Sequence, residues 1–317
     1  MPDSGRSHAF AYGVLFLMPL FFSSNLIFGR VAISTVEPWT LATLRWTLAF
    51  LVLLPFAWRG IIEHRQVFRD NWTMIVMLGL LSMWICGALV YFALRYTTAT
   101  NGTLIYTSSP VLIVLLEWAF RGRRISPREA LGIVTALVGV VMIVVKGDLD
   151  TLLGLRFNVG DIIFAIAAIS WAAYSVLLKR GEFSSVPTLS MFAVIAAAGA
   201  ATLFPFMIWE SIEVGTFPTD AGSWSSIAGI VIFSSVLAFS CFQYGIKVVG
   251  PAITGMFMYL LPPYGVMMAV LFLGETLRPF HFAGFVLIMT GLLLGTLPKD
   301  IIRRIRNLFG NVARSRG

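Results

Sequence analysis

Ten long apolar runs constrain the fold of this chain of 317 residues more than any other feature. A helix that crosses a bilayer needs about 20 predominantly apolar residues. The predicted spanning helices cover residues 11–31, 38–58, 72–95, 99–120, 128–146, 159–179, 187–209, 224–246, 251–273 and 279–297. Only 12% of the residues are charged, about half the share in a soluble domain. We therefore expect an all-α, polytopic membrane protein whose apolar excess faces lipid.

The positive charge is distributed as membrane topology requires. If the N-terminus is cytoplasmic, 17 of the 23 lysines and arginines fall in the loops and end segments of the cytoplasmic side, which is the expected bias. Both termini then lie inside, and ten spans satisfy the even number that this needs. The net charge of +8 forms no basic face on a soluble module, so we expect no nucleic-acid partner. The predicted location is the inner (cytoplasmic) membrane.

Both ends of the chain allow a second interpretation. The first run, 11–31, exceeds the roughly 7–15 residues of a signal-peptide core and lacks a small-residue cleavage site, so we interpret it as a spanning helix. The basic tail, 298–317, carries apolar residues on one helical face. They are Ile301, Ile302, Ile305, Leu308 and Phe309. A helix lying on the anionic inner leaflet and a frayed tail that only sets topology are equal alternatives.

The sequence repeats itself at an offset of 152 residues. This offset pairs Pro110 with Pro262, Phe120 with Phe272, Gly122 with Gly274, Pro127 with Pro279, Gly132 with Gly284, and Gly139 with Gly291. The predicted units are therefore two five-helix repeats, 11–146 and 159–297. Because five is an odd number of spans, the second repeat must be inverted relative to the first, as in many secondary transporters with a substrate site between the halves.

Several segments resemble the EamA-type branch of the drug/metabolite transporter superfamily. They are "NGTLIYTSSPVLIVLLEWAFRGRRISPREALG" in the first half, "TGMFMYLLPPYGVMMAVLFLGETLRPF" in the second, and "EPWTLATLRWTLAF" and "GDIIFAIAAISWAAYSVLLKR" elsewhere. Typical members carry a Gly-Glu pair in each half. Gly274 and Glu275 match it, whereas Arg123 occupies the corresponding first-half position. The resemblance implies a ten-helix transporter of the cytoplasmic membrane, commonly an exporter of amino acids or related metabolites.

Two charged residues lie not at the ends of predicted spans but well inside them, where a charge is costly. Arg45 cannot lose its proton, so it needs an acceptor: a substrate carboxylate, helix carbonyls or a lipid phosphate. A structural role that ties helices together is the favoured interpretation. Glu117 lies near cytoplasmic arginines, so an ion pair is favoured over proton coupling. Pro110 and Pro262 are candidate hinges, and a static kink is the alternative.

Polar and aromatic residues near the middle of the spans are the candidate substrate-binding set. Amide and hydroxyl groups facing lipid would lack partners, so they should point into the bundle. The set is Asn25, Trp84, Tyr91, Tyr106, Trp171, Tyr174, Gln243 and Tyr259. Trp84 and Tyr91, seven residues apart, are expected on one helical face. Aromatic walls with a few hydrogen-bonding groups suit a small amphiphilic metabolite. Packing explains each residue alone better, but at least some of the set are expected to line a central cavity.

Secondary transport, by export of a small polar or amphiphilic metabolite, is the leading functional hypothesis. A non-transporting scaffold or subunit is the second, and an intramembrane enzyme the third, because no nucleophile elbow or metal cluster is evident. Two separated cysteines and three scattered histidines predict no metal site, and no cofactor is expected. Without a phosphate-binding loop, ATP is not the direct driver. The expected partners are a small-molecule substrate and lipids, in a monomer or weak homodimer.

Overall fold

The computed structural model describes residues 4–33, 35–154, 158–214 and 217–296, and the predicted tail 298–317 lies outside the described residues. Ten helices in the described residues are long and apolar enough to cross a membrane, which confirms the predicted fold class. They cover Ser7–Gly29, Pro38–Glu63, Trp72–Ala93, Thr100–Arg121, Pro127–Val144, Val159–Leu178, Thr188–Val214, Ala221–Val249, Pro251–Leu273 and Pro279–Thr296, and are called spans 1 to 10 below.

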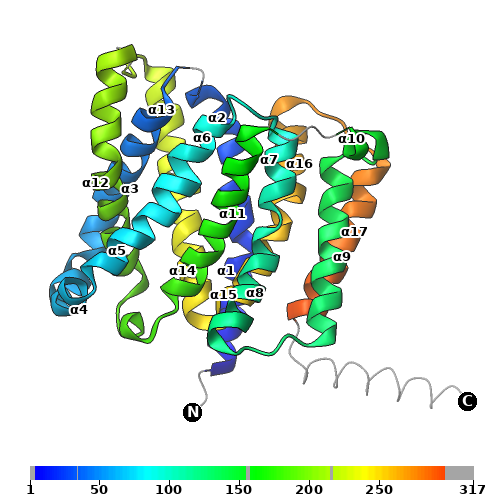
Figure 1. Ribbon diagram of the computed structural model, residues 1–317, viewed down its shortest axis with the longest axis horizontal. Coiled ribbons are helices and arrows are strands. Elements are labelled where there is room, and N and C mark those ends of the chain that lie inside the picture. The colour runs from blue at the N-terminus through cyan, green and yellow to red at the C-terminus, as the bar shows by residue number, and fades with distance from the viewer. Residues whose placement is uncertain (1–3, 34, 155–157, 215–216, 297–317) are drawn as a thin grey trace, which may run out of the picture.

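Half of the spans are built from more than one helical element (Figure 1). The first half contains α1 (Ser4–Ser23), α2 (Asn25–Ala32), α3 (Pro38–Glu63), α4 (Arg65–Asp70), α5 (Trp72–Gly79), the π-helix η1 (Leu80–Leu89), α6 (Val90–Ala93), α7 (Ala99–Tyr106), α8 (Ser109–Arg121), α9 (Pro127–Val144) and α10 (Leu149–Leu153). The second half contains α11 (Val159–Leu178), the 3₁₀-helix η2 (Gly181–Phe183), α12 (Thr188–Val214), α13 (Ala221–Gly229), the π-helix η3 (Ile230–Leu237), α14 (Ala238–Val249), α15 (Pro251–Met256), the 3₁₀-helix η4 (Phe257–Leu260), α16 (Leu261–Leu273) and α17 (Pro279–Thr296).

The interruptions of spans 3 and 4 recur at matching places in spans 8 and 9, whereas span 6, the counterpart of the interrupted span 1, is the single helix α11. Span 3 and its counterpart, span 8, each pass through a π-helix, η1 and η3. Pro110 and Pro262 lie in the first turns of α8 and α16, where a proline costs no helical hydrogen bond. Each proline therefore starts a new helix after a break in the span. Gly122 and Gly274 then end these helices with φ of 63° and 71°, the left-handed conformation that favours glycine.

Contacts between α9 and α17 give the repeat its geometry. A Cβ added to Gly132 would lie 2.6 Å from the carbonyl oxygen of Gly291, and a Cβ added to Gly139 would lie 2.6 Å from that of Gly284. The 152-residue offset pairs Gly132 with Gly284 and Gly139 with Gly291. Gly132 therefore contacts the counterpart of Gly139, and Gly139 contacts the counterpart of Gly132. Such a reciprocal contact is what a two-fold relation between the halves produces, and small residues allow the close approach in lipid.

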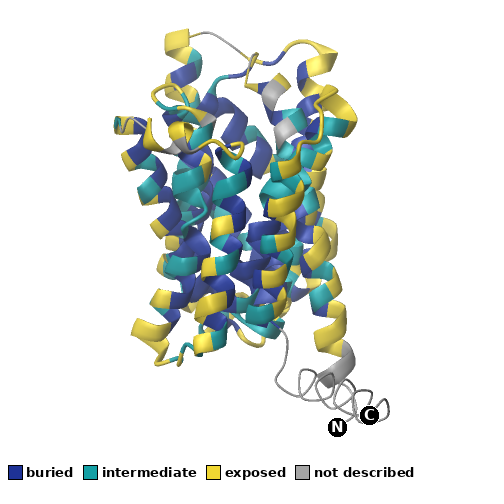
Figure 2. Ribbon diagram, turned by 90° about the vertical axis from the view of Figure 1, so that its right-hand side faces the viewer, coloured by how far each residue is buried: buried dark blue, intermediate teal, exposed yellow. Residues whose placement is uncertain are grey.

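The two ends of the bundle differ in charge. The described chain begins at Ser4 and leaves span 10 at Thr296 at the same end, the lower one in Figure 1. The ends of α3, α8, α11 and α14 also lie there, with Arg59, Arg121, Lys179 and Lys247. We call this the basic end. Figure 2 shows buried residues inside the bundle and exposed ones around its outer faces, as expected for helices that pack against one another within lipid.

Acidic residues at the opposite end of the bundle accept hydrogen bonds from the backbone N–H groups at helix N-termini. Glu210 of α12 accepts hydrogen bonds from the backbone nitrogens of Trp39 and Thr40, at 3.3 and 2.7 Å, in the first turn of α3. Asp161 forms a capping box with Asn158 at the start of α11. A carboxylate is favourable at a helix N-terminus because the backbone N–H groups there lack partners. These two buried acids are thus occupied by backbone groups.

Candidate functional site

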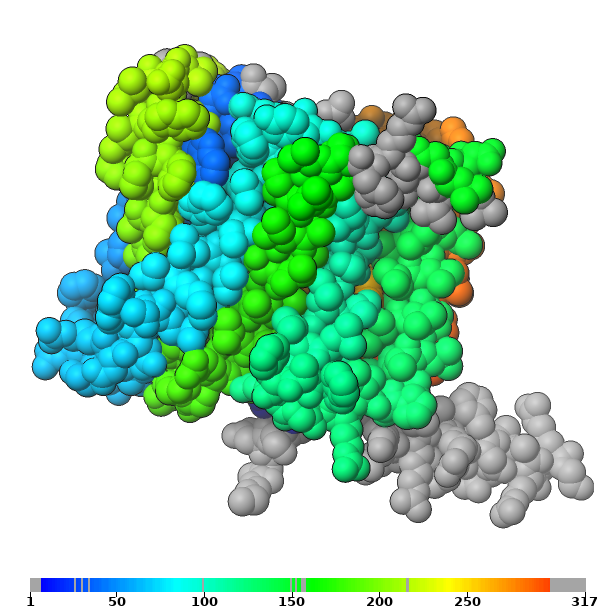
Figure 3. All heavy atoms as spheres, in the orientation of Figure 1, coloured from blue at the N-terminus to red at the C-terminus, as the bar shows by residue number. Residues whose placement is uncertain are grey.

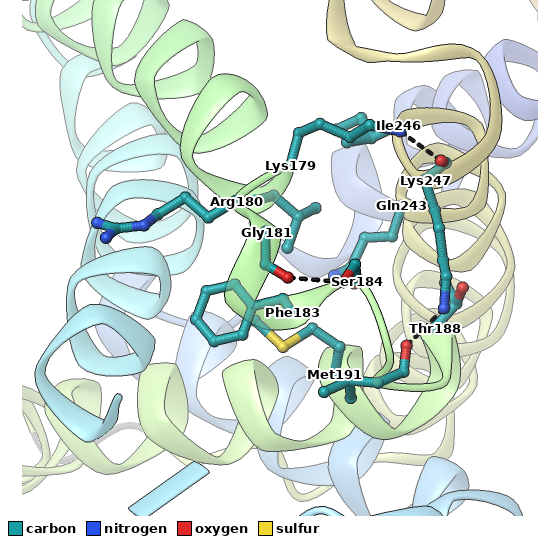
Figure 4. A pocket seen from close by; sticks show the side chains of 12 residues that line it. Lys179, Arg180, Gly181, Phe183, Ser184, Thr188, Met191, Gln243, Ile246 and Lys247 are labelled. Carbon is teal, nitrogen blue, oxygen red and sulfur yellow. Dashed lines mark hydrogen bonds between the residues drawn. The ribbon is translucent and has the colours of Figure 1, made fainter. Parts of the chain in front are cut away.

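A pocket of about 340 Å³ opens at the basic end, between the α11–α12 connection and α14 (Figure 4). Its lining residues are Leu178, Lys179, Arg180, Gly181, Phe183, Ser184, Val186, Thr188, Met191, Gln243, Ile246 and Lys247. The volume suits a small metabolite. Figure 4 shows the Arg180 side chain directed away from the others, so Lys179 and Lys247 supply the positive charge of the pocket.

The two lysines are held by backbone carbonyls. Lys179 Nζ donates to the carbonyl of Lys247 at 2.5 Å, and Lys247 Nζ donates to that of Val186 at 2.7 Å. Burial, followed by repulsion from Arg121, lowers the pKa of Lys179 from its ordinary value. No acidic residue lines the pocket in the part of the chain that the structure describes. The pocket therefore presents positive charge to whatever enters it.

Gln243 links the pocket to the interior. Its side chain lies at the pocket wall and donates through Nε2 to the Tyr174 hydroxyl at 2.9 Å. Both residues are buried, and the Gln243 Oε1 atom has no hydrogen-bond partner among the described residues. A buried polar atom without a partner calls for an explanation. Here it is an unpaired acceptor in the wall between the pocket and the interior.

An aromatic layer lies beyond Gln243. Its members are Phe22, Trp46, Trp171, Phe192, Phe239 and Phe242, from α1, α3, α11, α12 and α14. The Phe239 ring is its centre, with ring centroids of Trp46, Phe22, Trp171 and Phe192 at 4.8, 5.3, 5.5 and 5.6 Å. Trp171 also donates through Nε1 to Met258 Sδ at 3.0 Å. Because both halves contribute rings, the layer closes the space between them.

Arg45 lies on the far side of this layer, next to Trp46 in α3. The residue is 6% exposed, and its guanidinium donates to Ser235 Oγ at 2.6 Å and to the Tyr91 hydroxyl at 3.0 Å. The Tyr91 hydroxyl in turn donates to Asn25 Oδ1 at 3.4 Å. Three residues predicted separately from the sequence, Asn25, Arg45 and Tyr91, thus form one cluster that joins spans 1, 2, 3 and 8. Arg45 points into the bundle rather than toward lipid headgroups.

One face of span 8 contributes residues to the pocket, to the aromatic layer and to the Arg45 cluster. Phe239, Gln243 and Lys247 recur every four residues in α14, and Ser235 precedes them by four in η3. Side chains four apart lie on the same face of an α-helix, which aligns Phe239, Gln243 and Lys247, and the hydrogen bond to Arg45 places Ser235 at the end of the row. The sequence pattern polar–aromatic–polar–basic could have revealed this row, but only Gln243 was predicted. The contribution of the pocket lysines, from a loop and a helix end, was also missed.

Other predicted residues lie elsewhere. The Trp84 ring packs against Trp39 and Phe206, at 5.2 and 5.4 Å, away from the partners of Tyr91. The π-helix η1 explains this, because its turns hold more than 3.6 residues and seven residues are then not two turns. Tyr106 approaches Trp171 at 6.5 Å. Tyr259 is buried, and its hydroxyl has no partner among the described residues.

Glu117 is held at the basic end by basic side chains and a helix start. Its carboxylate lies 3.6 Å from Arg123 and 3.9 Å from Arg121, and it accepts a hydrogen bond from Ala252 N at 3.2 Å. Arg123, which replaces the family glutamate, also bonds Glu129 at 2.7 Å. This arrangement connects α8 to the start of span 9, and it favours the structural interpretation of Glu117.

Known proteins resemble this chain over nearly its whole length. The sequence model of the EamA-like transporter family matches residues 9–145 and 158–297. The uncharacterized transporter YyaM of Bacillus subtilis (strain 168) is 28% identical over 90% of this chain and 93% of its own. The uncharacterized inner membrane transporter YedA of Escherichia coli (strain K12) is 25% identical over 91% of each. A crystal structure with 22% identity has a TM-score of 0.75, covering 94% of this chain and 99% of that one, and supports the fold.

Proposed function

Because the chain belongs to the EamA-like transporter family and is a multi-pass membrane transporter, we propose that it exports a small polar or amphiphilic metabolite, such as an amino acid or derivative. The cargo passes by alternating access between the two repeats, 11–146 and 159–297. The protein lies in the cytoplasmic membrane with the basic end inside, as a monomer or weak homodimer. The family is one of transporters, so an intramembrane enzyme is no longer an alternative.

The row of side chains on span 8 is the observation that carries this proposal. It starts at a pocket that opens to one end of the bundle, passes the aromatic layer around Phe239, and ends at the Arg45 cluster. Helices of both halves face this row. A path that is open at one end and closed by packed rings is what one state of an alternating-access cycle requires.

The candidate hinges fit the same cycle. Pro110 and Pro262 start α8 and α16 after breaks in spans 4 and 9. A break that separates two helices absorbs a change of angle more readily than a continuous helix. We therefore propose that these breaks bend as the basic end closes and the opposite end opens.

Transport by the purified chain in liposomes is the direct test. We expect efflux of at least one member of a panel of amino acids and their derivatives. The Gln243→Leu variant should reduce that flux about tenfold or more, because it removes a buried hydrogen-bonding group that faces the path. Gln66→Leu is the matched control, since Gln66 is exposed at the basic end and bonds only Asp70. Flux of no panel member, with or without a proton gradient, would contradict the proposal.

A further inference from the structure

Arg45 is a buried cation whose charge no described acid neutralises. It is 6% exposed, and none of the ion pairs within 4.0 Å among the described residues includes it. A charge in a membrane interior is costly even when it has neutral partners. The buried acids Glu210 and Asp161 lie toward the end of the bundle opposite the basic end and are engaged elsewhere, at the starts of α3 and α11.

The donors of Arg45 are also incompletely used. A guanidinium has five N–H groups. Nε bonds Ser235 Oγ, Nη2 bonds both the carbonyl and the hydroxyl of Ser234 at 3.1 Å, and Nη1 bonds the Tyr91 hydroxyl. One N–H on Nη1 therefore has no hydrogen-bond partner among the described residues. The guanidinium carbon also lies 4.7 Å from the centroid of the Trp46 ring. Tyr91, which bonds Nη1, and Asn25, which bonds the Tyr91 hydroxyl, are only half-buried.

The rest of the proposed path carries the same sign of charge. Lys179 and Lys247 stand at the pocket, and the pocket lining in the described chain contains no aspartate or glutamate. Positive clefts attract anionic ligands and raise their local concentration. Among the described residues, a cargo ammonium would meet no carboxylate at the pocket and none paired with Arg45.

We propose that the cargo is recognised by a carboxylate, which Arg45 binds through its free donor while Lys179 and Lys247 attract it at the pocket. An ammonium group on the same cargo is tolerated but contributes nothing to recognition. Arginine suits this role because its fixed, always charged donors match carboxylate oxygens. The inference rests on the proposed transport function and names the substrate class of that path.

Four compounds that share one phenyl group test the inference on the full chain in lipid nanodiscs. Phenylalanine carries both charges, 3-phenylpropionate only the carboxylate, phenylalaninamide only the ammonium, and phenethylamine an ammonium without a carbonyl. We expect the two carboxylates to raise the midpoint of thermal unfolding, and to bind about tenfold or more tightly than the two amines. The inference would be overturned if the amines stabilised the protein as much as the carboxylates do. It would also be overturned if none of the four compounds stabilised it.

Variants of Arg45 test whether this residue itself binds the carboxylate of the cargo. Arg45→Gln should erase the preference between carboxylates and amines, while Arg45→Lys should keep part of it. Arg95→Gln is the control, because Arg95 is exposed and already paired with Glu37. A preference that survives in folded Arg45→Gln would contradict the assignment, and the wild-type comparison stands even if that variant does not fold. If amines were transported and the carboxylates were not preferred, the inference would be wrong and the proposed transport function would stand. If carboxylates bound but no compound were transported, the carboxylate preference would stand and the transport function would be wrong.

Discussion

The Gly291→Ala variant is expected to lose about 1–3 kcal/mol of stability, the usual cost of overpacking a close contact. A Cβ at Gly291 would lie 2.4 Å from the carbonyl oxygen of Gly132 and 2.5 Å from the backbone nitrogen of Ala136. Both atoms are main-chain atoms, so no side chain can turn away, and α17 must separate from α9. The measurement is the midpoint of thermal unfolding, together with the yield of monodisperse protein.

Two further variants give this prediction its control. Gly132→Ala should have a similar effect, because its Cβ would lie 2.6 Å from the carbonyl oxygen of Gly291. Gly265→Ala in α16 meets nothing within 4 Å, so it should be neutral, or stabilising by about 0.5–1 kcal/mol because alanine favours the helix. Equal midpoints for Gly291→Ala and Gly265→Ala would contradict the reciprocal packing of the two repeats.

Replacing Phe239 by alanine should weaken the protein and open the aromatic layer. A buried phenylalanine lost to alanine typically costs about 3–5 kcal/mol. Phe239 contacts rings from α1, α3, α11 and α12, so the cavity left behind would connect the pocket side with the Arg45 cluster. We expect a lower unfolding midpoint and a raised passive proton leak in liposomes, measured with an internal pH-sensitive dye.

Phe282→Ala provides the comparison for this leak. Phe282 is 61% exposed on α17, and its loss should change neither the midpoint nor the leak appreciably. If Phe239→Ala were as stable and as tight as Phe282→Ala, the aromatic layer would not be the barrier along the path. A loss of stability without any leak would place the barrier at another level of the bundle.

Much of the fold could be predicted from the sequence because it depends on hydropathy and on small residues. The ten spans follow from the length of the apolar runs, and Gly132, Gly139, Gly284 and Gly291 recur at the offset that the α9–α17 contact uses. The π-helices η1 and η3 could not be predicted, since π-helices depend on tertiary packing and carry no local sequence signal. Their effect is visible at Trp84, whose predicted alignment with Tyr91 assumed an α-helical turn.

The sequence predicted the buried polar members of the candidate site, but neither the pocket lysines nor the pairing of the members. The cost of unsatisfied polar groups in lipid indicates that Asn25, Arg45, Tyr91, Tyr174 and Gln243 point inward. Which of them meet depends on how the spans pack. On the face drawn in Figure 3, α11 runs between spans 3 and 4. It also contacts α14, where Tyr174 meets Gln243, whereas Tyr91 of span 3 meets Arg45. The sequence contains no signal for that order of spans.

Accessibility from each side of the membrane tests the central claim that one path runs along span 8 between the halves. The background is Cys86→Ser with Cys241→Ser, which removes both native thiols. A membrane-impermeant thiol reagent is then applied to Gln243→Cys and, separately, Asn25→Cys, in vesicles of each orientation. We predict that position 243 reacts only from the basic end and position 25 only from the opposite side. Reaction of both positions from the same side, or of neither from any side, would contradict the account.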